Sequence, residues 1–121
     1  MPLVNRLSLK KDFDRVFKQG KSCFDGIMGL RFLKNGLPHN RYGVIVSLKV
    51  SKQATSRNRV KRRLRELLRK NVNQTINGYD LVVIALPPIL NKKYQEIEQS
   101  LVRHLTKFSQ KRSGNSVKQK S

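Results

Sequence analysis

The chain has 121 residues, a length that suits one domain and is short for two. Its 27 lysines and arginines against 7 acidic residues give a net charge of +20, which is typical of a protein that binds nucleic acid or, less often, an anionic membrane surface. The sequence has no apolar run of about 18 residues and no signal-peptide pattern in its first residues, so we expect neither a membrane span nor secretion.

The first predicted element is a helix that follows an irregular N-terminus at residues 1–7. Its apolar residues recur at helical spacing and share one face: Leu9, Phe13, Val16 and Phe17. Ser8 is a suitable N-cap, and Gly20 is expected to take the left-handed conformation that often follows a helix.

Three strands are expected next. Lys21–Asp25 predicts a short edge strand, and Ile27–Lys34 predicts a second strand that ends at the turn signal Asn35-Gly36. Arg41–Leu48 alternates regularly, which favours a third strand. The residues on one face of this third strand are apolar: Tyr42, Val44, Val46 and Leu48.

The segment Ser56–Asn71, with the sequence SRNRVKRRLRELLRKN, predicts a strongly basic helix that Ser56 could cap. Its apolar residues have the spacing of one helix face: Val60, Leu64, Leu67 and Leu68. Most of the other positions are arginine or lysine. Because basic side chains three and four residues apart repel each other, a surface this uniform indicates a polyanionic partner rather than a merely solvated face.

A last strand and helix complete the predicted domain. Asn77-Gly78 marks a turn, and Leu81–Leu86 is apolar on both faces, as a central strand would be. Asn91 could cap a final helix. The core face of this helix would be formed by Tyr94, Ile97, Leu101, Leu105 and Phe108. Residues 110–121 are basic and polar, so we expect a disordered tail there.

The predicted order of elements is therefore α-β-β-β-α-β-α. Strands in a run with helices beside them favour an α+β fold, a two-layer sandwich of helices on a sheet. A single domain is expected to span residues 8–109.

The chain offers little for catalysis. The seven carboxylates are Asp12, Asp14, Asp25, Glu66, Asp80, Glu96 and Glu98. The closest pairs among them are two residues apart on predicted helices, a spacing that points the two side chains in different directions. His39 and His104 lack metal-ligand spacing, and Cys23, the single cysteine, has no local partner that would make it a nucleophile. We therefore expect no catalytic residue and no metal site, and Cys23 favours a reducing, cytoplasmic compartment.

The basic helix carries RNRVKR at Arg57–Arg62, followed by Arg65-Glu66, and this resembles the signature of the protein subunit of bacterial ribonuclease P. Other segments match that family in order and spacing, so the resemblance covers roughly residues 5–108. These segments are Asn5–Leu7, Phe13, Phe17–Gly20 and Gly43–Ser47.

The resemblance implies a fold like that of ribosomal protein S5 domain 2. It also implies two partners: the ribonuclease P RNA, which holds the catalytic Mg²⁺, and precursor tRNA, whose 5′ leader the enzyme removes. Neither a membrane nor DNA is implied as a partner. The protein would be an endonuclease subunit in tRNA processing, a hydrolase only as a ribonucleoprotein.

The resemblance also assigns residues to each RNA. Six would bind the ribozyme: Arg57, Asn58, Arg59, Lys61, Arg62 and Arg65. Phe13 and Phe17, which the helical pattern alone would place in the core, would line a cleft for the leader together with Lys49. We expect these two rings at the margin of the core, with Leu9 and Val16 pointing into it.

This sequence departs from the family at two cleft positions. Leu48 precedes Lys49 where the family commonly has two lysines, so one cation is missing. Arg31, followed by Phe32, falls where some members have a tyrosine, and the sequence leaves open which of the two faces the cleft.

The predicted function is thus the protein subunit of ribonuclease P. The alternative is a structural RNA-binding protein, ribosomal or RNA-annealing, without a role in cleavage. A peripheral membrane protein is a weaker alternative, because the apolar side of the basic helix is needed for the core.

Overall fold

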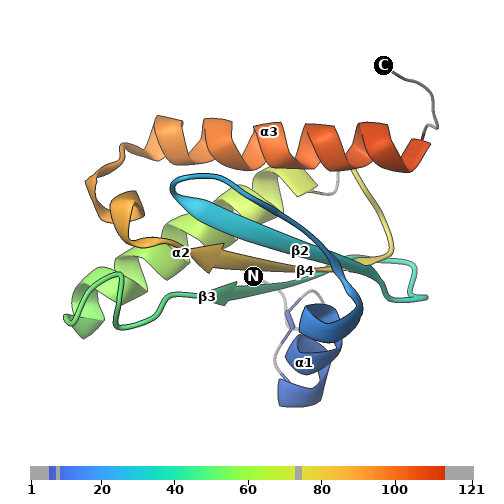
Figure 1. Cartoon of the computed structure of the whole chain (residues 1–121), viewed down its shortest axis with the longest axis horizontal. Helices are drawn as coiled ribbons and strands as arrows, with labels where there is room; N and C mark the ends of the chain where they lie inside the picture. The colour runs from blue at the N-terminus through green and yellow to red at the C-terminus, as the bar shows by residue number, and fades with distance from the viewer. Residues whose placement is uncertain (1–5, 8, 73–74, 114–121) are drawn as a thin grey trace.

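A four-stranded sheet with the strand order β1-β2-β4-β3 forms the centre of the molecule and carries helices on both faces (Figure 1). The computed structural model describes residues 6–7, 9–72 and 75–113. The elements are α1 (Lys10–Gln19), β1 (Lys21–Phe24), β2 (Met28–Lys34), β3 (Arg41–Ile45), α2 (Ala54–Asn71), β4 (Tyr79–Ala85), the 3₁₀ helix η3 (Pro87–Asn91) and α3 (Tyr94–Ser113). The predicted α+β class and element order are confirmed, with η3 as an addition.

β4 is the central strand that its apolar sequence predicted. It pairs with β2 in antiparallel and with β3 in parallel orientation, and β1 forms the other edge by antiparallel pairing with β2. The parallel pair is possible because α2 carries the chain back between β3 and β4. Since successive residues of a strand face opposite sides, β4 supplies Leu81 and Val83 to one core and Val82 to the other.

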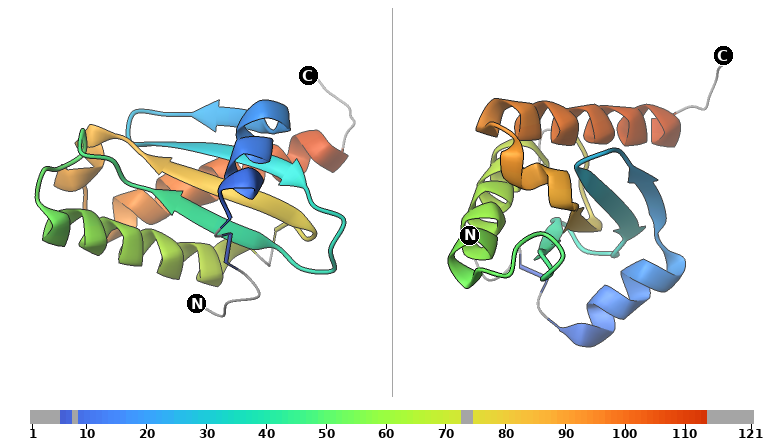
Figure 2. Two further views of the ribbon diagram at one scale, coloured as in Figure 1. Left: turned by 90° about the horizontal axis from the view of Figure 1, so that it is seen from below. Right: turned by 60° about the vertical axis from the view of Figure 1, so that its left-hand side comes forward.

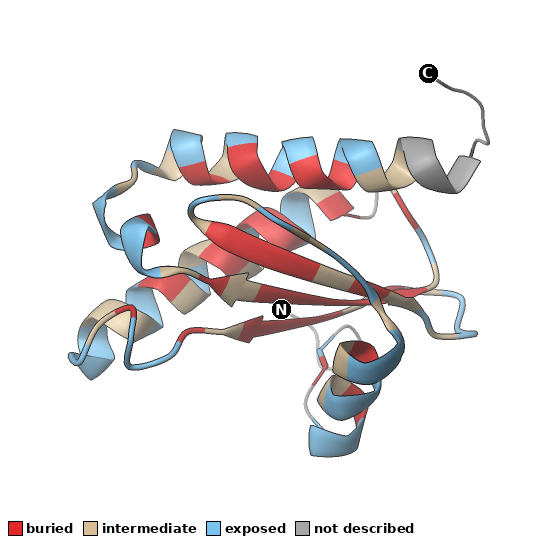
Figure 3. Cartoon of the chain, viewed as in Figure 1, coloured by how far each residue is buried: buried red, intermediate tan, exposed pale blue. Residues whose placement is uncertain are grey.

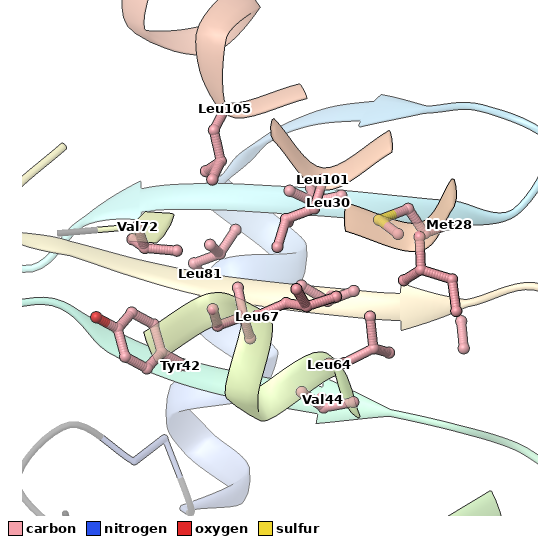
Figure 4. Packing of buried hydrophobic residues seen from close by; sticks show 14 of the residues in the cluster. Met28, Leu30, Tyr42, Val44, Leu64, Leu67, Val72, Leu81, Leu101 and Leu105 are labelled. Atoms are coloured by element: carbon pink, nitrogen blue, oxygen red, sulfur yellow. The ribbon is translucent and has the colours of Figure 1, made fainter. Parts of the chain in front are cut away.

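The main core lies between the sheet and the helices α2 and α3 (Figure 4). The apolar face predicted for the basic helix is confirmed, since four residues of α2 are buried there: Val60, Leu64, Leu67 and Leu68. From α3 come Ile97, Leu101 and Leu105, while Tyr94 and Phe108 are partly buried against the same cluster. Figure 3 shows that the exposed residues of α3 lie on the side away from the sheet.

A smaller core lies on the opposite face of the sheet, beneath α1. Val16 of α1, Leu7 and Val82 are buried there, and Phe13 and Phe17 are half-buried at its margin, as predicted. The prediction for Leu9 is wrong, because Leu9 is 54% exposed. It is the residue that precedes α1, with extended backbone angles, so it does not share the direction of the helical residues.

Two predicted helix ends are wrong in detail. Gly20 has φ −75° and ψ 155°, which is extended and not left-handed. A Cβ there would lie 2.5 Å from the carbonyl oxygen of Val16, so the absence of a side chain permits this close approach. α2 begins at Ala54 after Gln53, and Ser56 lies inside its first turn, where its hydroxyl donates to the Gln53 side chain. Ser8, the expected cap of α1, lies outside the described residues.

The third helix starts later and ends later than predicted. Asn91 belongs to η3, and α3 begins at Tyr94, where Oε1 of Glu96 accepts the amide hydrogen of Lys93 at 3.0 Å. Residues 110–113 continue the helix to Ser113, so the tail predicted from residue 110 is wrong for that stretch. Glutamine, lysine and arginine favour helix wherever a preceding helix can be extended. Residues 114–121 lie outside the described residues.

The turn between β1 and β2 is tied to α3 through Asp25, which lies just beyond the end of β1 instead of within it. Its Oδ1 accepts the amide hydrogens of Ile27 and Met28 at 2.9 and 3.0 Å. Its Oδ2 accepts the hydroxyl of Ser100 and lies 3.1 Å from Nε2 of His104. Burial lowers the pKa of His104 below its ordinary value, so the imidazole is neutral at neutral pH.

The hydrogen-bonded carboxylate of Asp25 leads us to expect that the protein loses stability in acid. Burial by itself would raise the pKa of Asp25, but the hydrogen bonds from Ser100 and the two amides outweigh it and lower the pKa from 3.8 to about 2. The contribution of Asp25 is therefore complete above about pH 4 and is lost as the pH falls towards 2. We expect Asp25→Asn to lower the free energy of unfolding at pH 7 by on the order of 1–2 kcal/mol, allowing for partial solvent exposure.

Urea unfolding of both proteins at pH 7 and near pH 2 checks this expectation. The difference between them should shrink in acid, since protonation removes the same charge that the substitution removes. If the two proteins differed by the same free energy of unfolding at both pH values, the loss could not be assigned to the charge of Asp25.

Candidate nucleic-acid interface

The side of α2 that faces away from the sheet is a cationic surface. Asn58, Arg59 and Arg62 are exposed there, while Lys61 and Arg65 are half-buried along its border. The buried apolar face of the helix determines this arrangement, because it fixes the helix against β3 and turns the remaining positions outward. Five of the six residues predicted to meet an RNA are thus brought together on one accessible surface.

Arg57 is different, because its guanidinium already has partners within the protein. Nη1 of Arg57 donates to the carbonyl oxygens of Ser51 and Lys52, both at 3.0 Å. These contacts hold the loop that leads from β3 into the first turn of α2. Arg57 therefore orders the start of the basic helix, and only its remaining N–H groups are available to a ligand.

Arg6 extends the cationic surface beyond α2. Arg6 forms an isolated parallel bridge with Tyr42 of β3, and the amide of Leu7 donates to the carbonyl oxygen of Tyr42 at 2.7 Å. The pKa of Arg65 is lowered by its partial burial and, to a smaller extent, by the positive charge of Arg6, so these two guanidinium groups repel each other. Two like charges brought together in this way favour an anionic ligand. The interaction between Arg6 and Arg65 is not evident from the sequence, because the two residues are far apart along the chain.

α1 lies on the face of the sheet opposite the main core (Figure 2, left), and we call this face the open face. It carries the second group of candidate residues, which includes Phe13, Phe17 and Arg31. Phe13 lies against Gly43 so closely that a Cβ on Gly43 would be 2.5 Å from its ring. The Arg31 guanidinium lies 5.3 Å from the centre of the Phe17 ring, within the range of a cation–π contact. Its Nη1 also donates to the carbonyl oxygen of Phe17 at 3.2 Å. An aromatic ring and a cation are thus paired at the border between α1 and the sheet.

The choice between Arg31 and Phe32 is decided by the pleat of β2. Arg31 faces α1, and Phe32 faces the main core, where it is 2% exposed and stacks on Phe108 with ring centres 3.9 Å apart. Assigning Phe32 to the leader cleft is therefore wrong, since neighbouring residues of a strand point to opposite faces. Lys49 is exposed in the turn after β3, at the end of the open face nearest to the start of α2.

A network of ion pairs around two buried carboxylates fixes α1 on the sheet. Asp80 of β4 is fully buried and accepts two hydrogen bonds from Arg41, at 2.8 and 2.7 Å. Arg15 of α1 reaches both Asp80 and Asp12, each at 3.3 Å. The Asp80 carboxylate raises the pKa of Arg41, so the pair stays ionised. Asp12 is buried and Asp14 is exposed, which confirms that their spacing separates them.

Within residues 6–7, 9–72 and 75–113, no group of three or more histidine, cysteine, aspartate or glutamate side chains is placed to hold a metal ion. Over the same residues, no helix combines the length and the hydropathy of a bilayer span. The cationic side of α2 and the pairing of Phe17 with Arg31 suit the binding of an unpaired polyanionic strand.

The chain is similar in sequence to known proteins. A model of the family Ribonuclease P matches residues 1–109. The ribonuclease P protein component of Clostridium botulinum strain Loch Maree is 41% identical over 104 residues, which cover 85% of this chain and 93% of that protein. The corresponding protein of Alkaliphilus oremlandii is 37% identical over 109 residues, covering 90% of this chain and 95% of that one.

Solved structures agree with the sequence relatives. The ribonuclease P protein from Thermotoga maritima superposes with a TM-score of 0.77 at 33% identity, covering 84% of this chain and 96% of that chain. The Staphylococcus aureus protein gives a TM-score of 0.76 at 30% identity, covering 87% of this chain and 94% of that chain. The chain therefore belongs to the family of ribonuclease P protein components.

Proposed function

We propose that this protein binds ribonuclease P RNA through the outer side of α2 and holds the 5′ leader of precursor tRNA on the open face of the sheet. The observation that carries this proposal is the position of two different surfaces. Arg59 and Arg62 form part of a cationic surface suited to a folded RNA backbone, while Phe13, Phe17 and Arg31 form an aromatic and cationic border suited to unpaired nucleotides.

The protein contributes binding and not bond cleavage. In this proposal Mg²⁺ is held by the RNA subunit and the substrate, and the RNA carries out the endonucleolytic step that forms the mature 5′ end. The excess of positive charge lowers the repulsion between two RNA molecules that must come together. A leader of variable sequence is best held by ring stacking and phosphate contacts, since neither reads base edges. The proposal places this work in the bacterial cytoplasm, with no part for DNA or a membrane.

Phe17 gives the proposal a direct test. Replacing Phe17 with alanine should weaken binding of precursor tRNA to the reconstituted ribonucleoprotein by about 1–3 kcal/mol, the free energy of one lost base stack. Binding of mature tRNA, which has no leader, should hardly change. The affinities of the two substrates are measured by equilibrium binding for the wild type and the variant.

The conservative variant Phe17→Tyr keeps an aromatic ring and serves as the control, because it should retain most of the affinity for the precursor. Equal losses of affinity for both tRNAs would show that Phe17 acts only as a core residue. Leader binding would then have to be assigned to other residues of the open face.

A further inference from the structure

Two rows of residues cross the open face of the sheet, and they differ in what covers them. The pairing registers place Ser22, Arg31, Val82 and Gly43 in the first row, and Phe24, Gly29, Ile84 and Ile45 in the second. The first row lies under α1, because Phe17 pairs with Arg31, Val16 packs with Val82, and Phe13 contacts Gly43.

The second row continues the open face beyond α1. Phe24 is 52% exposed, and Ile45 and Ile84 are half-buried. Figure 2 (left) shows that, among the described residues, no helix lies over the part of the open face towards the start of α2, where β3 ends. The second row therefore forms an apolar floor next to the aromatic and cationic border of α1.

The ring of Phe24 lies directly over its neighbour across the strands, Gly29. A side chain at position 29 would bring its Cβ within 2.2 Å of Cε2 of Phe24, so only glycine allows the ring to occupy this position. The ring covers Gly29 of β2 and remains half exposed at the open surface. A large aromatic side chain held in this way has the form of a stacking platform.

We propose that Phe24 forms a further nucleotide subsite, in which its exposed ring stacks on one base of the single-stranded leader. This inference rests on the proposed function and names an additional contact for the same substrate. Phe24 and Arg31 are diagonal neighbours on β1 and β2, with an expected separation of about 7–8 Å. That separation is roughly twice the rise of about 3.4 Å per nucleotide in a stacked strand, so the two subsites suit nucleotides of an extended, unstacked leader.

Charge favours an RNA strand as the occupant of this floor. Arg31 lies in the adjoining row, and neither row contains an acidic residue. Asp25 follows Phe24 in the chain, but its carboxylate is directed to Ser100 and His104 of α3, on the other side of the sheet. A phosphate chain would therefore meet positive charge along this path without an opposing carboxylate from either row.

The experiment uses the reconstituted ribonucleoprotein and precursor tRNAs whose leaders are lengthened one nucleotide at a time. Phe24→Ala should bind the shortest-leader substrates and mature tRNA as the wild type does. Once the leader is long enough to reach Phe24, the affinity of Phe24→Ala should fall about fivefold or more below that of the wild type. Phe24→Tyr should restore the affinity. Leu90→Ala, which truncates an exposed apolar side chain on η3, should show no such step.

Three results would overturn the proposal for Phe24. A loss that is the same at every leader length would mean that the substitution acts through folding, which thermal melting of the free protein also reports. The absence of any loss would mean that the ring does not meet the leader. A change in the oligomeric state of the RNA-free protein would identify the surface as a contact between two copies of the chain.

The Phe17→Ala protein is measured in the same series, which separates the two proposals. If Phe17→Ala weakens binding of precursor but not mature tRNA while Phe24→Ala has no effect, only the additional subsite is rejected. If neither variant distinguishes the substrates, leader binding on the open face is rejected as a whole.

Discussion

Replacing Asp80 with asparagine is expected to lower the free energy of unfolding by about 3–5 kcal/mol, the cost of removing one partner from a buried ion pair. Asp80 is fully buried, and its two oxygens accept hydrogen bonds from Arg41, Arg15 and Asn35. The amide would leave the Arg41 guanidinium with a weaker contact at 3.5 Å to Asp12 as its main source of charge compensation. Urea unfolding with an unchanged m-value would measure the loss.

Asp14→Asn is the matched control, since Asp14 is exposed on α1 and the substitution changes the net charge by the same amount. It should change the free energy of unfolding by less than about 0.5 kcal/mol, as surface substitutions usually do. A similar small effect for Asp80→Asn would contradict the view that this network fastens α1 to the sheet.

The second large effect separates the two sides of α2. Leu64→Ala is expected to destabilise the protein by about 2–5 kcal/mol, because Leu64 is fully buried in the main core. Its affinity for ribonuclease P RNA, measured where the variant is still folded, should be close to that of the wild type.

The double substitution Arg59→Ala and Arg62→Ala should do the reverse. Both side chains are exposed, so the melting temperature should change little, while ribozyme binding should weaken. If each arginine meets one phosphate, the slope of log K against log salt should become less steep by roughly 1.4–1.8 in total. The same double change at Lys92 and Lys93, which lie between η3 and α3, removes equal charge and serves as the control. A variant at Arg59 and Arg62 that melts far below the wild type would mean that the faces of α2 are assigned the wrong way round.

Much of the fold could be predicted because the decisive signals are local. The spacing of Val60, Leu64 and Leu67 determines which side of α2 is buried, and the continuous apolar run in β4 determines that this strand is central. Helix ends were harder to predict. Ser56 and Asn91 are good capping residues by type, but the tertiary structure starts both helices elsewhere.

The candidate site depends on contacts that a single sequence does not reveal. Arg41 and Asp80 are far apart in the chain, and only the parallel pairing of β3 with β4 places them opposite each other. The choice between Arg31 and Phe32 required the register of β2, because a shift of one residue exchanges the two faces of a strand. No pattern in the sequence distinguishes Phe24 as a binding residue. Its proposed role follows from the position of its ring over Gly29.

The most direct test of the proposed function is cleavage of precursor tRNA by a bacterial ribonuclease P RNA at low Mg²⁺, with and without the purified protein. The protein should enhance cleavage at the mature 5′ end, and the protein freed of all RNA should cleave nothing. Binding without enhanced cleavage would contradict the proposal and favour a structural RNA-binding protein. Nuclease activity that remains after complete removal of RNA would contradict the assignment of catalysis to the RNA.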